Sequence, residues 1–352
     1  MSSENKSAIS FFEKYLTVWV ILCMTAGILI GKYLPGIPDF LEKIQYAQQN
    51  IPIAILIWIM IYPMMMKIDF KSIKNVGKHP TGVIISTGTS WLIKPFLMFG
   101  LASFFFYVVF KAFIPAELAQ SYVTGAVLLG AAPCTAMVFV WSNLTNGDPA
   151  HTLVQVSIND MLIIVLFVPI VSFLLGVNNI FIPWDTLLFS IVLFVVVPLT
   201  AGFITRTVMI KKHGDEYFNE KFVPKFDGIT TFGLLLTLVI IFTFQGDVIL
   251  DNPFHVLLIA VPLILQNVIT AIFAYLMCKV TKQPHNIAAP AALIGASDFF
   301  ELSVAVAISL FGPDSPVVLV TTVGVLTEVP TMLTLVKFVN KTQHWFPSPK
   351  TK

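Results

Sequence analysis

Residues 130–137 read Gly-Ala-Ala-Pro-Cys-Thr-Ala-Met and lie inside a long apolar run. Pro133 has no amide proton, so the carbonyl of Leu129, four residues earlier, loses its helical partner and a break in the helix is predicted. Unwound backbone at membrane depth is tolerated only where it is buried in protein or lines a wet cavity. The first side chain after the break is the thiol of Cys134, so we predict that this stretch forms half of a binding site.

The composition around this stretch is that of a polytopic membrane protein. Of the 352 residues, 57% are hydrophobic and 11% are charged, whereas an ordinary soluble domain has about 25% charged residues. Runs near the roughly 20 residues that cross a bilayer give the candidate spans. The ten candidates are approximately residues 15–34, 51–66, 82–110, 121–143, 152–176, 185–209, 228–246, 254–279, 287–311 and 316–339.

The placement of Lys and Arg predicts the orientation of these spans. If the N-terminus is cytoplasmic, most of the 21 basic residues fall in cytoplasmic segments, and the outside loops hold only Lys32, Lys43 and Lys111. This asymmetry follows the positive-inside rule. A missed or invented span would scramble the alternation, so we expect ten spans in the cell membrane with both termini cytoplasmic.

Ten spans divide into two halves of five, and an odd number per half inverts one half relative to the other, as in many secondary transporters. Weak internal similarity agrees, since residues 129–131 align with 294–296 and Asp160 then corresponds to Glu328. We therefore predict an all-α fold whose fourth and ninth spans are equivalent, broken and crossing. The expected segments are a cytoplasmic N-terminal segment 1–14, repeats 15–176 and 177–339, and a C-terminal tail 340–352.

The ninth span contains Asp298 and Glu301, whose spacing would place both acids on one helical face. An acid at the helix centre costs about 2.5–3.5 kcal/mol by insertion scales, so two acids should face a cavity rather than lipid. Two nearby carboxylates in a low-dielectric site cannot both ionise cheaply, which makes proton carriage their natural use. Alternatively, the acids cap a helix break at Gly295 and Ser297, where Asp298 fits an N-cap.

Cys134 has two interpretations. A free cysteine usually packs as a small hydrophobe, and Cys23 and Cys278 fit that description. At Cys134 the preceding proline and the small neighbours, beginning at Gly130, favour a binding role, because a thiolate is a soft ligand for thiophilic ions. Thr135 adds a hydroxyl beside the thiol.

Other polar side chains interrupt the apolar runs. Lys94 in the third span requires a partner carboxylate, for which Asp160 and Glu301 are the candidates, either in a structural ion pair or in a cavity. Asn159 and Asp160 in the fifth span and Glu328 in the tenth either line the cavity or bridge helices.

Longer motifs add a resemblance. Residues 130–142, followed by a turn at 147–149 and by residues 159–160, resemble the signature of the arsenite efflux permeases in the bile acid/arsenite/riboflavin transporter superfamily. Residues 299–308 and 324–330 resemble the second-half signatures of that family. The likeness extends over nearly the whole chain.

The resemblance implies the same ten-helix inverted repeat and extrusion of trivalent arsenic driven by the proton gradient, with Cys134 and Glu301 as the central pair. Trp141, which by its own pattern is an interfacial anchor, becomes a candidate substrate contact. Further positions that the family motifs mark are Phe300, Asn159 and Glu328. Asp298 departs from the family, which usually has Asn there, and adds a second acid to the proton coupling.

We therefore expect a secondary active transporter rather than an enzyme, with arsenite as cargo, antimonite as a further candidate, protons as coupling ions and the lipid bilayer as surroundings. The sequence has no phosphate loop and no metal-ligand cluster, so neither a cofactor, nucleic acid nor an ATPase subunit is expected. The alternative is sodium-coupled uptake of an organic anion, as in the bile acid relatives. A receptor is disfavoured by the span count, and a metal-binding scaffold would bind arsenic without flux.

Overall fold

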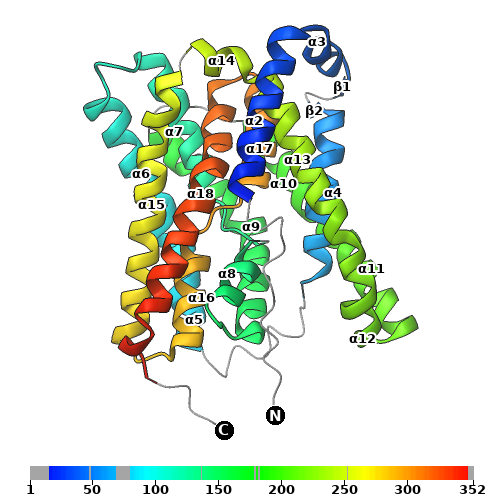
Figure 1. The fold of residues 1–352 in the computed structure, drawn as a ribbon, viewed down its shortest axis with the longest axis vertical. Coiled ribbons are helices and arrows are strands. Elements are labelled where there is room, and N and C mark those ends of the chain that lie inside the picture. Colours follow the sequence, from blue (N-terminus) through cyan, green and yellow to red (C-terminus); the bar gives the residue numbers. More distant parts are fainter. Residues whose placement is uncertain are drawn as a thin grey trace.

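The computed structural model describes residues 16–46, 49–68, 80–135, 137–177, 180, 183–251 and 253–347. Figure 1 shows a helical molecule whose long helices run side by side along one direction. Among the described residues, strands are limited to β1 (Gln45–Tyr46) and β2 (Gln49–Asn50), which pair antiparallel. The predicted N-terminal segment 1–14 lies outside the described residues.

Each predicted apolar run contains helix in the structure, and two of the runs, 121–143 and 287–311, are interrupted. Up to residue 177 the elements are α2 (Leu16–Tyr33), α3 (Gly36–Lys43), α4 (Ile51–Met66), α5 (Pro80–Gly88), the π-helical turn η2 (Thr89–Ile93), α6 (Lys94–Phe104), the π-helical turn η3 (Phe105–Val109), α7 (Ala116–Gly130), α8 (Val138–Leu144) and α9 (Pro149–Val177). The all-helical class predicted from the apolar runs is therefore confirmed.

The remainder of the chain repeats this alternation of long and interrupted helices. Its elements are α10 (Trp184–Ile191), the π-helical turn η4 (Val192–Val196), α11 (Val197–His213), α12 (Asp215–Tyr217), the turns η5 (Phe218–Phe222) and η6 (Val223–Phe226), α13 (Asp227–Phe244), α14 (Gly246–Asp251), α15 (Pro253–Val280), α16 (His285–Ala296), α17 (Phe300–Phe311), α18 (Pro316–Lys341) and η7 (Gln343–Trp345).

Five continuous helical stretches of the described chain are long and apolar enough to cross a membrane. They are Pro80–Val109, Pro149–Val177, Trp184–His213, Pro253–Val280 and Pro316–Lys341. Shorter apolar helices accompany them at Val18–Tyr33, Ile51–Met66, Phe232–Phe244 and Phe300–Phe311. The chain is thus a multi-pass membrane protein, as its composition predicts.

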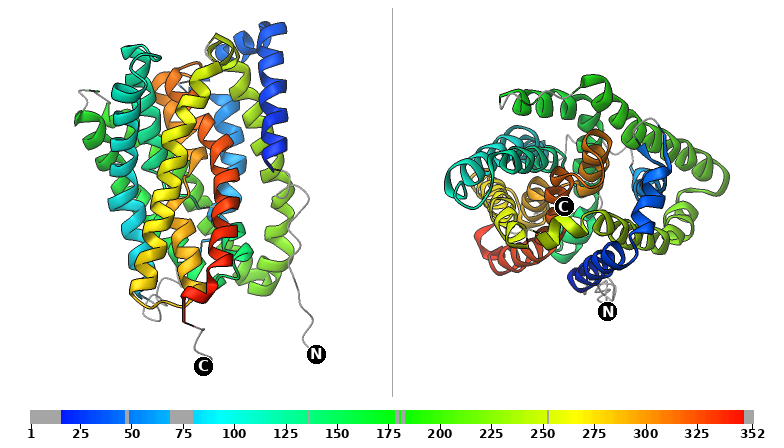
Figure 2. Two further views of the ribbon diagram at one scale, coloured as in Figure 1. Left: turned by 60° about the vertical axis from the view of Figure 1, so that its left-hand side comes forward. Right: turned by 90° about the horizontal axis from the view of Figure 1, so that it is seen from above.

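The helices form two groups (Figure 2, right). The smaller group, which we call the gate bundle, consists of α2, α4, α11 and α13, which contact one another. Gly27 permits a close approach within it, because a Cβ there would lie 2.5 Å from the carbonyl oxygen of Val239 on α13. The larger group, the core bundle, contains α5, α6, α7, α8, α9, α15, α16, α17 and α18. The interrupted helices belong to the core bundle.

Candidate functional site

Two interruptions meet inside the core bundle. Helix α7 ends at Gly130 and α8 begins at Val138, while α16 ends at Ala296 and α17 begins at Phe300. The predicted breaks are therefore confirmed, although α7 ends before Pro133. The carbonyl of Leu129 is not left unpaired as predicted, because it accepts from the amide of Ala132 at 3.3 Å in a tighter turn.

The two interruptions are joined by backbone hydrogen bonds. Pro133 and Asp298 face each other in an isolated antiparallel bridge. The amide of Cys134 donates to the carbonyl of Ser297 at 3.2 Å, and the amide of Phe299 donates to the carbonyl of Ala132 at 2.9 Å. Backbone groups that would be orphaned at membrane depth therefore satisfy one another.

Lys94 completes this crossing from α6. Its side chain is fully buried, and its ammonium donates to the carbonyl of Ala132 (3.2 Å), the carbonyl of Ser297 (2.8 Å) and Oδ1 of Asp298 (2.9 Å). The π-helical turn η2 immediately precedes Lys94. Such turns insert a residue into the helical ladder and are common at functional sites.

The partner of Lys94 differs from both sequence-based candidates. We predicted Asp160 or Glu301, whereas the structure pairs the ammonium with Asp298. The reason is the helix break: Asp298 precedes α17 and does not share a helical face with Glu301, which lies inside that helix. The prediction of one acidic face was therefore wrong, and the two carboxylates occupy different surroundings.

Glu328 and Asn267 also bond to Asp298 and its neighbours. Glu328 on α18 accepts from the hydroxyl of Ser297 and, at 3.1 Å, from the amide of Asp298. In the orientation that satisfies its amide, Asn267 on α15 donates to the carbonyl of Ala296 and to Oδ2 of Asp298, both at 3.1 Å. Glu328 and Asn267 thus hold the Asp298 backbone and carboxylate in place.

Cys134 lines a small cavity at the crossing, together with Asp298 and Glu328. The cavity volume is about 20 Å³, enough for roughly one water molecule. It lies between the bundles, because Val20 of α2 and Leu234 of α13 complete a wall otherwise made by the core bundle. Its lining residues are Val20, Cys134, Met137, Trp141, Leu234, Asp298, Phe300, Val325, Glu328 and Val329.

Several polar atoms near Cys134 have no hydrogen-bond partner among the described residues. They are Thr135 Oγ1, Trp141 Nε1 and Glu301 Oε2. Glu301 and Thr135 are buried without lining the cavity, but Glu301 and Glu328 both lie within electrostatic reach of the thiol. The surroundings of Cys134 therefore have hydrogen-bonding capacity that the protein itself leaves unused.

Asn159 and Asp160 do not line this cavity, whereas Trp141 does. Asn159 Oδ1 accepts from Trp91 Nε1 at 3.1 Å, which makes it a bridge between helices. Asp160 is buried, and neither of its carboxylate oxygens has a partner among the described residues. Trp141 is only 2% exposed, so its interpretation as an interfacial anchor was wrong.

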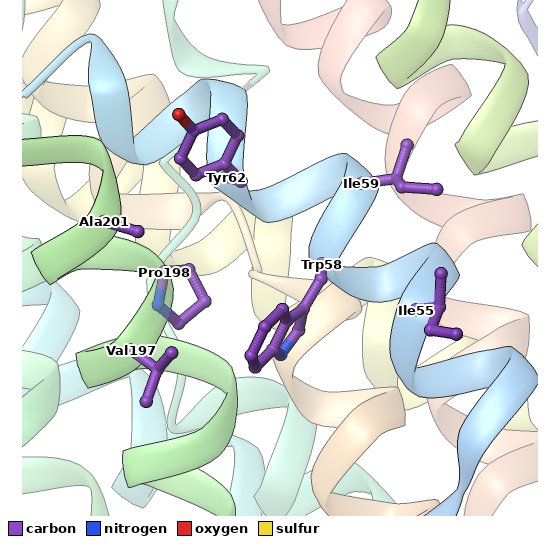
Figure 3. A pocket seen from close by; sticks show the side chains of 7 residues that line it. All are labelled: Ile55, Trp58, Ile59, Tyr62, Val197, Pro198 and Ala201. Atoms are coloured by element: carbon purple, nitrogen blue, oxygen red, sulfur yellow. The ribbon is translucent and has the colours of Figure 1, made fainter. Parts of the chain in front are cut away.

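A larger pocket lies outside the crossing and has a different character. Figure 3 shows it between α4 and α11, where Trp58 and Tyr62 face Val197, Pro198 and Ala201. Its volume is about 280 Å³ and its lining surface is apolar. Because Trp58 Nε1 already donates to Leu193 O and the Tyr62 hydroxyl pairs with that of Thr205, this groove offers no polar group to a small polar cargo.

Comparison with known proteins gives this geometry a family. The model of the Sodium Bile acid symporter family matches residues 54–252. The arsenical-resistance protein Acr3 of Alkaliphilus metalliredigens is 58% identical over 351 residues, which cover 99% of this chain and 98% of that protein. The chain belongs to the arsenite efflux permease family. As a family member it is a membrane transporter.

Two more distant relatives of this family member also match nearly the whole chain. The arsenical-resistance protein Acr3 of Corynebacterium glutamicum is 32% identical over 339 residues, covering 93% of this chain and 88% of that protein. An uncharacterized transporter of Synechocystis is 41% identical over 353 residues, covering 98% of this chain and 92% of the relative. The similarity therefore includes both interrupted helices.

Sequence reasoning missed several residues of this family member's site. Asn267, which holds Asp298, was overlooked, although the adjacent polar pair Gln266-Asn267 in an apolar run was an available signal. The apolar lining residues carried no such signal, because a valine or leucine that faces a cavity looks the same in sequence as one in the core. These residues are Val20, Leu234, Val325 and Val329.

Proposed function

We propose that this transporter extrudes trivalent arsenic from the cytoplasm in exchange for protons and so confers arsenic resistance. The observation that carries the proposal is the Cys134 thiol in a cavity at the boundary of two helix bundles. The arsenical-resistance names of the relatives from Alkaliphilus and Corynebacterium support the cargo. Antimonite, which is chemically similar, is proposed as a second cargo.

The proposed architecture is ten spans in two inverted five-helix repeats, residues 15–176 and 177–339. The pattern of helix contacts supports it, because exchanging the halves maps one set of contacts onto another. The contact of α2 with α13 corresponds to that of α11 with α4, and the contact of α7 with α18 corresponds to that of α16 with α9. Long helices α9 and α18 follow the two interrupted segments in turn.

The proposed location is the cell membrane, with both termini cytoplasmic. Helices α11, α15 and α18 end at the lower side in Figure 1. The basic residues at or just beyond these ends are Arg206, Lys211, Lys212, Lys279, Lys282, Lys337 and Lys341. By the positive-inside rule this is the cytoplasmic side.

The proposed binding step is exchange at arsenic. The sulfur of Cys134 forms a bond to As(OH)3 while one As–OH bond breaks, and the thiol proton leaves with that hydroxide as water. Neither arsenic nor sulfur changes oxidation state. The cavity holds about one water molecule, so the gate and core bundles must separate before the cargo enters. Rocking of one bundle against the other would then expose the site alternately to each side.

Glu301 is the proposed proton carrier, because one of its carboxylate oxygens is buried without a partner. When arsenic binds from the cytoplasm, Glu301 releases its proton inward. When water displaces arsenic from sulfur on the outside, Glu301 takes up a proton there. Because As(OH)3 is neutral, the proton supplies the drive: one charge across 100 mV is worth about 2.3 kcal/mol, or roughly fiftyfold in concentration. Asp298, already paired with Lys94, supports the site instead.

Sodium-coupled uptake of an organic anion is less well supported. The family description includes sodium symporters, but the cavity contains a thiol and acids and no described basic side chain lines it. An anionic cargo would meet Asp298 and Glu328 there. An electrostatic penalty of this kind selects against anions.

The test is arsenite uptake into everted membrane vesicles under an imposed proton gradient. We expect gradient-dependent uptake by the native chain and the same uptake by Cys278→Ser. Cys134→Ser should lose uptake about 100-fold or more, because a sulfur–arsenic bond is stronger than the hydrogen bond that serine could offer instead. Cys278 is a matched control because it is buried in α15, away from the cavity. Equal uptake by Cys134→Ser and the native chain would contradict the proposal.

A further inference from the structure

The crossing of the interrupted helices gathers negative charge at one point. Helices α7 and α16 both end there, and the carboxyl end of each helix carries the negative pole of its dipole. The carbonyls of Ala132 and Ser297 and the carboxylate of Asp298 converge on this point. Such a set of oxygens in a dry interior requires a cation.

The oxygens around this point are held by groups other than Lys94. The carbonyls of Ala132 and Ser297 each accept a backbone amide from the opposite interruption. Asp298 is fixed through its second carboxylate oxygen by Asn267 and through its amide by Glu328. These oxygen atoms should therefore keep their arrangement without the ammonium group.

Carbonyl and carboxylate oxygens are also the ligands of hard metal cations. In sodium-coupled transporters built on discontinuous helices, unwound carbonyls and half-helix carboxyl ends coordinate Na⁺. Here the same kinds of oxygen surround Nζ of Lys94 at 2.8–3.2 Å. Figure 1 shows α6, the helix that begins at Lys94, beside α7 and α15 in the core bundle.

We propose that the Lys94 ammonium is a built-in cation that takes the place of a bound sodium ion at the helix crossing. A positive charge is therefore always present at the crossing, so transport does not require sodium. The proton remains as the coupling ion. Removing the amine opens a site for a small monovalent cation. The inference about coupling rests on the proposed transport function, whereas the cation site itself does not.

The first experiment measures thermal unfolding of the purified full chain in sodium chloride and in choline chloride at equal ionic strength. We expect the melting temperature (Tm) of the native chain to be the same in both salts. Lys94→Ala should melt lower in choline chloride and regain several degrees in sodium chloride or methylammonium chloride, with a saturable dependence on concentration. Lys94→Ala/Asp298→Asn is the matched control and should respond to neither cation.

A folded Lys94→Ala variant that neither cation stabilises would overturn the proposal, as would equal stabilisation of the double variant. If Lys94→Ala cannot be purified in sodium chloride, Lys94→Gln is tested in the same way. The glutamine amide keeps a neutral donor at the crossing, and an absent sodium effect on that variant would overturn the proposal too.

The second experiment measures arsenite flux in proteoliposomes with and without sodium. Native flux should be independent of sodium, and Lys94→Ala flux should rise at least tenfold when sodium replaces choline. A sodium requirement in the native chain would overturn the proposal. Absence of arsenite flux in the native chain, together with sodium stabilisation of Lys94→Ala, would instead refute the proposed function and leave the cation site standing.

Discussion

Two sets of polar side chains at the helix crossing differ in how completely their atoms are paired. Lys94, Asp298 and Glu328 form an unbroken set of hydrogen bonds. Trp141 Nε1 and Glu301 Oε2 are buried without a described partner. Paired polar atoms fix a structure, whereas unpaired ones are available to a cargo or a proton. One short crossing thus holds both a rigid support and groups free to react.

The largest expected effect comes from breaking the ion pair between Lys94 and Asp298. Lys94→Met leaves the Asp298 carboxylate buried without its cation, and breaking a buried ion pair from one side costs about 3–5 kcal/mol. Lys94→Met/Asp298→Asn should recover most of that loss, because no charge is left uncompensated. Thermal unfolding of the purified variants in choline chloride measures both values. If the double variant is no more stable than the single one, the pair is not the source of the stability.

The next effect separates proton coupling from arsenite binding and concerns Glu301. Glu301→Gln cannot exchange a proton, so the gradient-driven accumulation of arsenite should fall by roughly the fiftyfold that 100 mV supplies. Arsenite counterflow between equal pH values should persist, because Cys134 remains. Everted vesicles with an imposed potential measure the accumulation, and Glu117→Gln, at the exposed start of α7, is the control. Native accumulation in Glu301→Gln would exclude Glu301 as the carrier.

The smallest effect concerns Trp141, whose indole nitrogen lacks a partner although the ring lines the cavity. Trp141→Phe removes one donor available to an arsenic hydroxyl, a loss of about 1 kcal/mol. We expect a KM for arsenite raised about fivefold with an unchanged Tm. Initial rates in proteoliposomes measure it, and Trp184→Phe, at the exposed start of α10, is the control. A lowered Tm with native KM would assign Trp141 a packing role.

The apolar periodicity predicted the helices but not their interactions across the fold. Runs such as 51–66 coincide with α4 because length and hydropathy are local properties. The partner of Lys94 lies 204 positions away, and no local pattern identifies a pairing at that distance. Pro133 indicated the first interruption through its missing amide. At the second, the break was predicted from the internal repeat, but the helical face predicted for Asp298 and Glu301 was wrong because Asp298 lies within the break.

The site was predictable in its chemistry more than in its geometry. Of the expected substrate contacts, Cys134, Trp141 and Phe300 line one cavity, whereas Glu301 and Thr135 are buried without lining it. Asn159 and Asp160 do not line it, although they belong to the same motifs. Asn159 accepts from Trp91, and Asp160 is buried without a partner among the described residues. Residue type and resemblance identified the right segments. Which of their side chains line the cavity and which bond to other helices depends on packing, which the sequence does not show.

The central claim is that arsenite leaves in exchange for a proton carried by Glu301. The most direct measurement records lumenal pH in sodium-free proteoliposomes loaded with arsenite, with the membrane potential clamped by potassium and valinomycin. We predict that outward arsenite flow acidifies the lumen with the native chain and not with Glu301→Gln. Arsenite efflux without acidification, or equal acidification by both proteins, would contradict the account.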